Sequence, residues 1–150
     1  MTVRVQAEDF QVGDEIARLR AGNPRVGAVV SFIGTVRDLN EGQGVSTLTL
    51  EHYPGMTERS LADICDQARA RWDLEDLLVI HRYGELRPLD QIVLVVTTSA
   101  HRGEAFLACE FIMDYLKTQA PFWKKETTAQ GERWVQARDT DDEAAQRWST

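Results

Sequence analysis

The chain has 150 residues, 43% of them hydrophobic, and a formal net charge of −7 at pH 7. This length corresponds to one ordinary domain, and the acidic balance argues against a protein that binds nucleic acid through phosphate contacts. No apolar run reaches the roughly 18 residues of a transmembrane helix, and the N-terminus lacks the pattern of a secretory signal. The sequence therefore predicts one cytoplasmic domain over residues 1–150, without a membrane segment.

The first half of the chain alternates between short strands and helices. Strands are expected at 3–6, 27–38 and 46–53, and helices at 12–20 and 56–71. In the third strand Leu48, Leu50 and His52 fall on one face because side chains alternate along a strand. In the second helix the apolar residues Leu61, Ile64, Cys65 and Ala68 recur at helical spacing, which indicates a buried stripe.

The second half begins with two strongly apolar strands at 76–84 and 91–99, separated by a loop at 85–90. A helix is expected at 102–118, ended by Pro121, and a hairpin should follow, turning at 129–132. The acidic end, at about 139–150, is typical of a solvated tail. Helices and strands mix without strict alternation, so the predicted fold class is α+β with a mostly antiparallel sheet.

The two cysteines, Cys65 and Cys109, lie on the apolar stripes of predicted helices. Free cysteine behaves as a small hydrophobic residue, so both are expected to be buried thiols. Neither a CxxC motif nor a Cys/His spacing typical of zinc ligands is present. The sequence therefore predicts no metal site, and the thiols fit a reducing compartment.

A first candidate site is the segment TTSAHRGEAF at 97–106, where a strand ends and a helix begins. Free N–H groups at a helix N-terminus favour anions, Arg102 offers a bidentate donor, and His101 offers one that can titrate near neutrality. The alternative is that both are ordinary exposed polar residues at a helix start. A second candidate is Arg37 in GTVRD, which either points into a cleft or pairs with Asp38 or Glu41 on the surface.

The third candidate is YLKTQAPFWKKE at 115–126, which contains all three lysines of the chain, whereas the other fourteen basic residues are arginines. An amine can lose its proton at usable pH when it is partly desolvated or lies near other cations, and a guanidinium cannot. Lys124 and Lys125 should point to opposite faces of a strand, and we expect Lys124 to share a pocket with Lys117. The alternative is that lysines merely complement a helix C-terminus, which explains Lys117 but not the concentration of all three.

Arg102 and Lys117 are fifteen positions apart on one predicted helix, about 22 Å at the helical rise. The two cations therefore cannot close on one side of a small ligand. Either the ligand lies along the helix or the pocket forms across a dimer, which we favour. The other two histidines, His52 and His81, are expected to be structural.

Together these segments resemble the catalytic, large subunit of molybdopterin synthase. The resemblance rests on GAVVSFIGTVRD, LTLEHYPGMTE, VIHRYGEL, TSAHRGEAF, FIMDYLKTQAPFWKKE and WVQAR, in this order over roughly residues 10–148. It implies an α/β-hammerhead-type fold and a homodimer within a heterotetramer. It also implies sulfur transfer from the C-terminal Gly-Gly thiocarboxylate of a ubiquitin-like carrier to cyclic pyranopterin monophosphate, forming the dithiolene of molybdopterin without a cofactor or metal.

The same resemblance implies roles for individual residues. Lys117 and Lys124 correspond to catalytic lysines. The residues implied in substrate binding are Phe32, Thr35, Val36, Arg37, His101, Arg102, Met113, Lys125, Glu126 and Arg138. Two other functions use the same residues: an anion-binding module that docks a partner protein without turnover and, less well supported by this short chain, a Schiff-base lysine enzyme with a pyridoxal cofactor.

Overall fold

The computed structural model describes residues 1–37, 47–128, 131–135 and 139–149. The strands are β1 (Thr2–Gln6), β2 (Ala28–Thr35), β3 (Thr47–His52), β4 (Asp76–Arg82), β5 (Gly84–Leu86), β6 (Gln91–Ser99), β7 (Phe122–Thr128) and β8 (Gly131–Val135). The helices are α1 (Val12–Arg20), α2 (Met56–Arg71), α3 (Arg102–Gln119) and α4 (Asp139–Gln146). The predicted mixture of helices with mostly antiparallel strands is confirmed.

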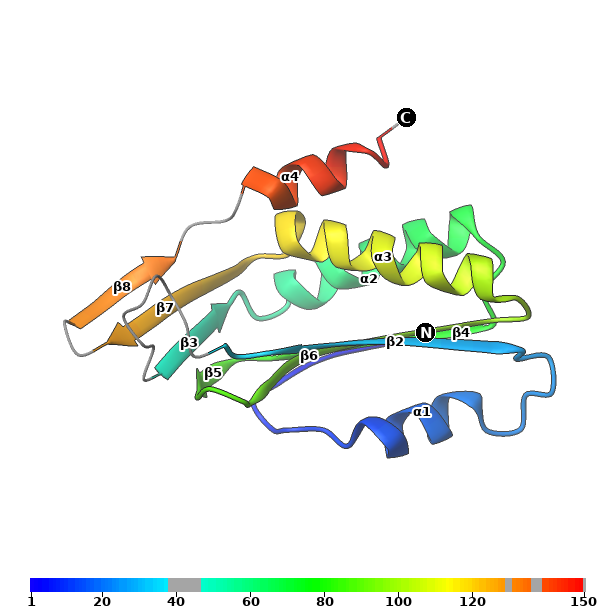
Figure 1. The fold of residues 1–150 in the computed structure, drawn as a ribbon, viewed down its shortest axis with the longest axis horizontal. Helices are drawn as coiled ribbons and strands as arrows, with labels where there is room; N and C mark the ends of the chain where they lie inside the picture. Colours follow the sequence, from blue (N-terminus) through cyan, green and yellow to red (C-terminus); the bar gives the residue numbers. More distant parts are fainter. Residues whose placement is uncertain (38–46, 129–130, 136–138, 150) are drawn as a thin grey trace.

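The first sheet has the strand order β1-β4-β6-β2, with β1 parallel to β4 and the other pairs antiparallel. Helix α1 covers one face, and α2 and α3 cover the other (Figure 1). The central strands β4 and β6 are buried on both faces, which explains their continuous apolar sequences. Leu77 and Val79 face α2 and α3, whereas Leu78 and Ile80 pack against residues of α1.

The second sheet has the order β5-β3-β7-β8 and is antiparallel throughout. Leu48 and Leu50 of β3 are buried together with Leu86 of β5 and Val36, which follows β2. This confirms the predicted alternation of β3. On the opposite face, Trp123 and Trp134 remain partly exposed, so only one face of this sheet packs on the core.

Two elements differ from the sequence-based expectation. Strand β5 extends into the region at 85–90 that was predicted to be a loop, and its three residues pair with β3. The acidic end, expected to be a solvated tail, contains α4 and packs on α3. Two residues that follow α4 in the chain bind Asp114 of α3. The indole Nε1 of Trp148 donates a hydrogen bond to its carboxylate (2.7 Å), and Arg147 forms an ion pair with the same carboxylate (2.8 Å).

A buried threonine links the start of α2 to the start of β7. The hydroxyl of Thr57, which is fully buried, accepts a hydrogen bond from the Tyr53 amide (3.0 Å) and donates one to the Pro121 carbonyl (3.4 Å). Gly55 before the helix has a φ of +85°, a conformation that glycine adopts without strain. These contacts fix the chain between α3 and β7, where Pro121 ends the helix.

Both cysteines are free and buried, as the sequence predicts. Burial raises the pKa of the Cys65 thiol and of the Cys109 thiol to about 12 in each case, mainly because the thiolate would lose its hydration. We therefore expect neither thiol to react with a disulfide reagent in the folded protein at pH 8, and both to react rapidly in denaturant. Rapid modification of either thiol without unfolding would contradict this.

None of the helices in the described parts of the chain is long and apolar enough to cross a membrane.

Candidate active site

The lysines at 117 and 124 lie at the junction of the two sheets. Lys117 is in the last turn of α3, and its side chain is exposed. Lys124 is the third residue of β7 and lies opposite Leu50 of β3, whose side chain faces the core. Directly opposed residues of antiparallel strands share a face, so Lys124 is on the inner face of this sheet.

His81, near the end of β4, is a buried group on which the positive charges of both lysines act. Its side chain stacks on the ring of Phe122, with centroids 3.7 Å apart and an interplanar angle of 18°. The pKa of His81 is lowered to about 3, mainly because the buried imidazolium would lose its hydration; the contact with the Arg82 carbonyl opposes this, and the positive charges of Lys117 and Lys124 contribute to the lowering. The imidazole is therefore neutral wherever the protein is folded near neutral pH.

The third lysine, Lys125, lies on the opposite face of β7. Its Nζ is 3.5 Å from a carboxylate oxygen of Glu132 and 5.6 Å from the ring centroid of Trp134. This confirms that adjacent lysines of the strand diverge, and it separates Lys125 from Lys117. Glu126 returns to the inner face, opposite Leu48, and only 8% of it is exposed.

A surface pocket of about 400 Å³ also opens beside β3 and β7. It is lined by Glu51, His52, Tyr53, Trp123 and Trp134. Most of these side chains belong to the Lys125 face, so this hollow is separate from the inner face that holds Lys124. The chemistry of the lysine pair, rather than the size of a hollow, identifies the candidate site.

The end of β2 approaches the same inner face. Val36 is buried with Leu48 and Leu50, and its backbone bonds to Asp90 and Leu89. This anchors the strand end and leaves the adjacent Thr35 and Arg37 exposed near the second sheet. The alternative pairing of Arg37 with Asp38 or Glu41 lies outside the described residues. Phe32, earlier on β2, is 39% exposed.

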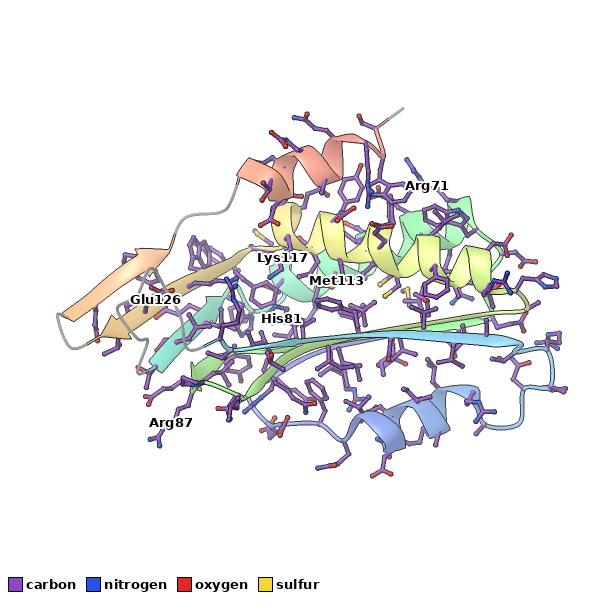
Figure 2. All side chains as sticks on the ribbon, viewed as in Figure 1. Arg71, His81, Arg87, Met113, Lys117 and Glu126 are labelled. Atoms are coloured by element: carbon purple, nitrogen blue, oxygen red, sulfur yellow. The ribbon has the colours of Figure 1, made fainter. Side chains whose placement is uncertain are left out.

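Helix α3 separates the remaining candidates. Met113 is one turn before Lys117 and is buried at 9% exposure, close to the lysine end of the helix (Figure 2). His101 and Arg102 are exposed at the opposite end, about 22 Å from Lys117 at the helical rise. One chain therefore does not bring these two groups around a small ligand. Arg138 lies outside the described residues.

Sequence reasoning treated His81 as a structural histidine and missed its position beside the lysines. The available signal was a single ionisable residue at the end of the apolar strand LLVI. Its partners come from α3 and β7, which no local pattern relates to β4. Among the described residues, no group of three or more His, Cys, Asp or Glu side chains is arranged to hold a metal ion.

Because His81 is neutral when folded, stability should depend on pH. The folded pKa of about 3 is below the unfolded value of 6.5, so the unfolded chain binds an extra proton as pH falls from 6.5 towards 3, and stability is lost in that window. From pH 7 to 5.5 we expect this residue to reduce the free energy of unfolding by about 1 kcal/mol. Urea unfolding should show a flatter pH dependence for His81→Phe; an unchanged slope would contradict the assignment.

Comparison with known proteins agrees with this arrangement. The model of the MoaE protein family matches residues 5–119. A molybdopterin synthase catalytic subunit from Ralstonia nicotianae is 70% identical over 147 residues, covering 98% of this chain and 84% of the relative.

Two solved structures are similar in fold as well as in sequence. The molybdopterin biosynthesis MoaE protein of Burkholderia ambifaria is 57% identical, with a TM-score of 0.85, covering 99% of this chain and 98% of the other. Molybdopterin synthase from Staphylococcus aureus is 32% identical, with a TM-score of 0.83, covering 89% of this chain and 96% of the other. The chain with the lysine pair described above therefore belongs to the MoaE protein family, whose relatives are named as molybdopterin synthase catalytic subunits.

Proposed function

We propose that this chain is the catalytic subunit of a molybdopterin synthase in molybdenum cofactor biosynthesis, acting in the cytoplasm. It would transfer sulfur from the thiocarboxylated Gly-Gly end of a small ubiquitin-like carrier to cyclic pyranopterin monophosphate. The observation that supports this best is the position of Lys117 in the last turn of α3 and of Lys124 on the inner face of β7, which follows α3 directly, in a chain that belongs to the MoaE family. A relative with 70% identity is named for this activity.

In each transfer the carrier supplies the nucleophile. A thiocarboxylate sulfur forms a C–S bond with a side-chain carbon of the pterin, while a C–O bond at that carbon breaks and its oxygen leaves as water or as a phosphate oxygen. Water then hydrolyses the bond between sulfur and the carrier's acyl carbon, so that the sulfur stays on the pterin and the carrier ends in a carboxylate. Two such transfers give the dithiolene. The catalytic chain must therefore supply and remove protons and stabilise charge at the acyl carbon, tasks that suit positioned amines.

We assign different tasks to the two lysines. Lys117, exposed at the end of α3, would lie beside the incoming carrier tail, polarise its acyl group and, as a titratable amine, exchange a proton there. Lys124, on the inner face of β7, would act as acid or base on the pterin side chain. Met113 and Phe32 would supply apolar contacts, and Lys125 and Glu126 would continue the binding segment.

The anionic end of the substrate requires a second group of residues. Arg37, His101, Arg102 and Arg138 are the proposed anion contacts, with Thr35 and Val36 beside Arg37. Because α3 places His101 and Arg102 about 22 Å from Lys117, we propose that they serve the lysine pair of a second copy. The working assembly would be a homodimer that binds one carrier per chain, a heterotetramer.

A single-turnover reaction tests this function. The purified chain is mixed with thiocarboxylated carrier and cyclic pyranopterin monophosphate, and the product is oxidised to its fluorescent derivative. Formation of the dithiolene product, lost in Lys117→Ala, is expected. Stable carrier binding without product would instead favour the anion-binding module, and a bound aldimine absorbance would favour the Schiff-base enzyme.

A further inference from the structure

The motif HYPGMTE at 52–58 forms a hydrogen-bonded corner between β3 and α2. The amide of Tyr53 donates a hydrogen bond to the hydroxyl of Thr57 (3.0 Å), and the amide of Thr57 donates one back to the Tyr53 carbonyl (2.9 Å). Gly55, whose φ is +85°, donates its amide to Glu58 (2.6 Å) in a capping box at the helix start. Thr57 is the second residue of α2 and has no exposed surface. None of the proposed catalytic or substrate-binding residues lies in this motif.

The hydroxyl of Thr57 also reaches the segment that joins the two lysines. It donates a hydrogen bond to the carbonyl oxygen of Pro121 (3.4 Å), which a hydroxyl can do while it accepts one from the Tyr53 amide. Pro121 lies just before the first residue of β7 that pairs with β3, so its carbonyl is outside the ladder of the sheet. It is four positions after Lys117 and three before Lys124. The bond therefore attaches the middle of this connection to the start of α2.

The connection is restrained on both sides of that carbonyl. The proline ring fixes its own φ, and the amide of Phe122 donates a hydrogen bond to the carbonyl of Ala120 (2.9 Å). The ring of Phe122 stacks on the buried His81, with centroids 3.7 Å apart. The six residues at 118–123 therefore have little conformational freedom between the end of α3 and the third residue of β7.

We propose that Thr57 is a positioning residue for the lysine pair. Its buried hydroxyl fixes the Pro121 carbonyl and thereby the backbone from which both amines extend. This inference rests on the proposed function for its catalytic meaning. Thr57 acts through the backbone and not by contact with a substrate. The effect on the reaction can still be large, because a displacement of catalytic groups by about 1 Å can lower a rate by about 100-fold.

One NMR signal reports the tethering bond directly. Among the four prolines of the chain, only Pro121 precedes a phenylalanine. Protein labelled with ¹³C at proline carbonyls and with ¹⁵N at phenylalanine amides therefore gives a single correlation, across the peptide bond from Pro121 to Phe122. We expect Thr57→Val to move this ¹³C signal upfield, because the carbonyl loses its donor, and Thr57→Ser to restore it. An identical signal in Thr57→Val and the wild type would overturn the proposal.

Kinetics test the effect on the reaction. In Thr57→Val, where a methyl group of similar size replaces the hydroxyl, we expect kcat to fall about tenfold and KM to change by about twofold or less. The two amines are displaced, whereas the proposed anion contacts at the other end of α3 are unaffected. Thr57→Ser keeps the hydroxyl and should recover most of kcat. Wild-type kcat in Thr57→Val, or an equal loss in Thr57→Ser, would overturn the proposal; Thr57→Ala provides the same test if the valine variant does not fold.

Thr98→Val is the matched control. The hydroxyl of Thr98 is also fully buried; it accepts a hydrogen bond from the amide of Asp76 (2.8 Å) and donates one to the carbonyl of the same residue (2.9 Å). Thr98 alternates along β6 with Leu94 and Val96, which pack against residues of α1 on the face of the sheet away from α3. We expect this variant to lose a similar amount of thermal stability but to keep kcat within about twofold of the wild type. A tenfold loss here as well would mean that Thr57→Val acts by general destabilisation, and the positioning role would be wrong.

The outcomes distinguish this inference from the proposed function. If the wild-type chain yields no dithiolene product, the proposed function fails, and the catalytic role of Thr57 fails with it even where the carbonyl signal shows the tethering bond. If the wild-type chain is active and Thr57→Val is equally active, the function stands and only the positioning role fails.

Discussion

Replacing Lys117 with arginine should reduce single-turnover sulfur transfer by about 100-fold or more, although the positive charge is retained. A guanidinium does not release its proton at usable pH, and a positioned acid or base contributes roughly 10²- to 10⁴-fold to a rate. Lys117 is exposed at the end of α3, so the larger head group should be accommodated without unfolding. Product formation measured by fluorescence, with the carrier in excess, checks this.

The matched control is Arg20→Lys, which exchanges the same two cations in the last turn of α1. Helix α1 covers the face of the first sheet opposite to α3 (Figure 1), so this exchange should leave turnover unchanged. Full activity in Lys117→Arg would show that only the charge at position 117 is needed, and the proton-transfer role of this amine would then be wrong.

Replacing Phe111 with alanine should lower the free energy of unfolding by about 3–5 kcal/mol, the usual cost of removing a buried aromatic ring. Phe111 has no exposed surface. Its ring meets Trp72 edge-on at 5.3 Å and Trp148 at 5.5 Å, and the guanidinium of Arg71 lies 4.8 Å from its centroid. The cavity would therefore loosen α2, α3 and the C-terminal segment together. Urea unfolding monitored by circular dichroism measures the loss.

Phe106→Ala on the same helix provides the comparison. Phe106 is 59% exposed, so its replacement should change stability by about 0.5 kcal/mol or less. If the two variants were equally stable, or if Phe111→Ala lost under about 1 kcal/mol, the aromatic cluster would not be the anchor of the C-terminal segment.

The predictable parts of the fold are those in which the spacing of apolar residues along the sequence indicates which side chains are buried. The bounds of α1 and α2 agree with the sequence prediction, and the stripe of Leu61, Ile64 and Cys65 is buried. The long apolar runs of β4 and β6 were recognisable because both of their faces are covered. The same reasoning failed for β5, because three residues are too few to show an alternation of apolar and polar side chains. Its pairing with β3 depends on the tertiary fold and not on the local sequence.

Helix α4 was missed for a related reason. Its sequence DTDDEAAQ reads as a solvated segment by charge alone, and what holds it against α3 are the side chains that follow it, Arg147 and Trp148, on Asp114. The charge composition of a segment does not indicate its tertiary contacts. Here the segment is bound by the carboxylate of Asp114 and by the ring of Phe111, which are both on α3.

The candidate site was predictable in part. Strand alternation alone separated Lys124 from Lys125, and the structure confirms that the two point apart. The length of α3 alone separated Arg102 from Lys117. The position of His81 was beyond reach, because it depends on the end of β4 in the first sheet meeting the start of β7 in the second, where the rings of His81 and Phe122 stack. The chemical roles of these residues remain predictions.

The short distance along the chain between Lys117 and Lys124 has a consequence for the energetics of folding. Seven positions separate them, so in a flexible unfolded chain they would still lie about 15 Å apart on average, within the roughly 30 Å screening length of dilute salt. Their repulsion is therefore present before the protein folds as well as after, and only the difference between the two states opposes folding. Two like charges can be kept together in this way at a smaller cost in stability than if they came from distant segments.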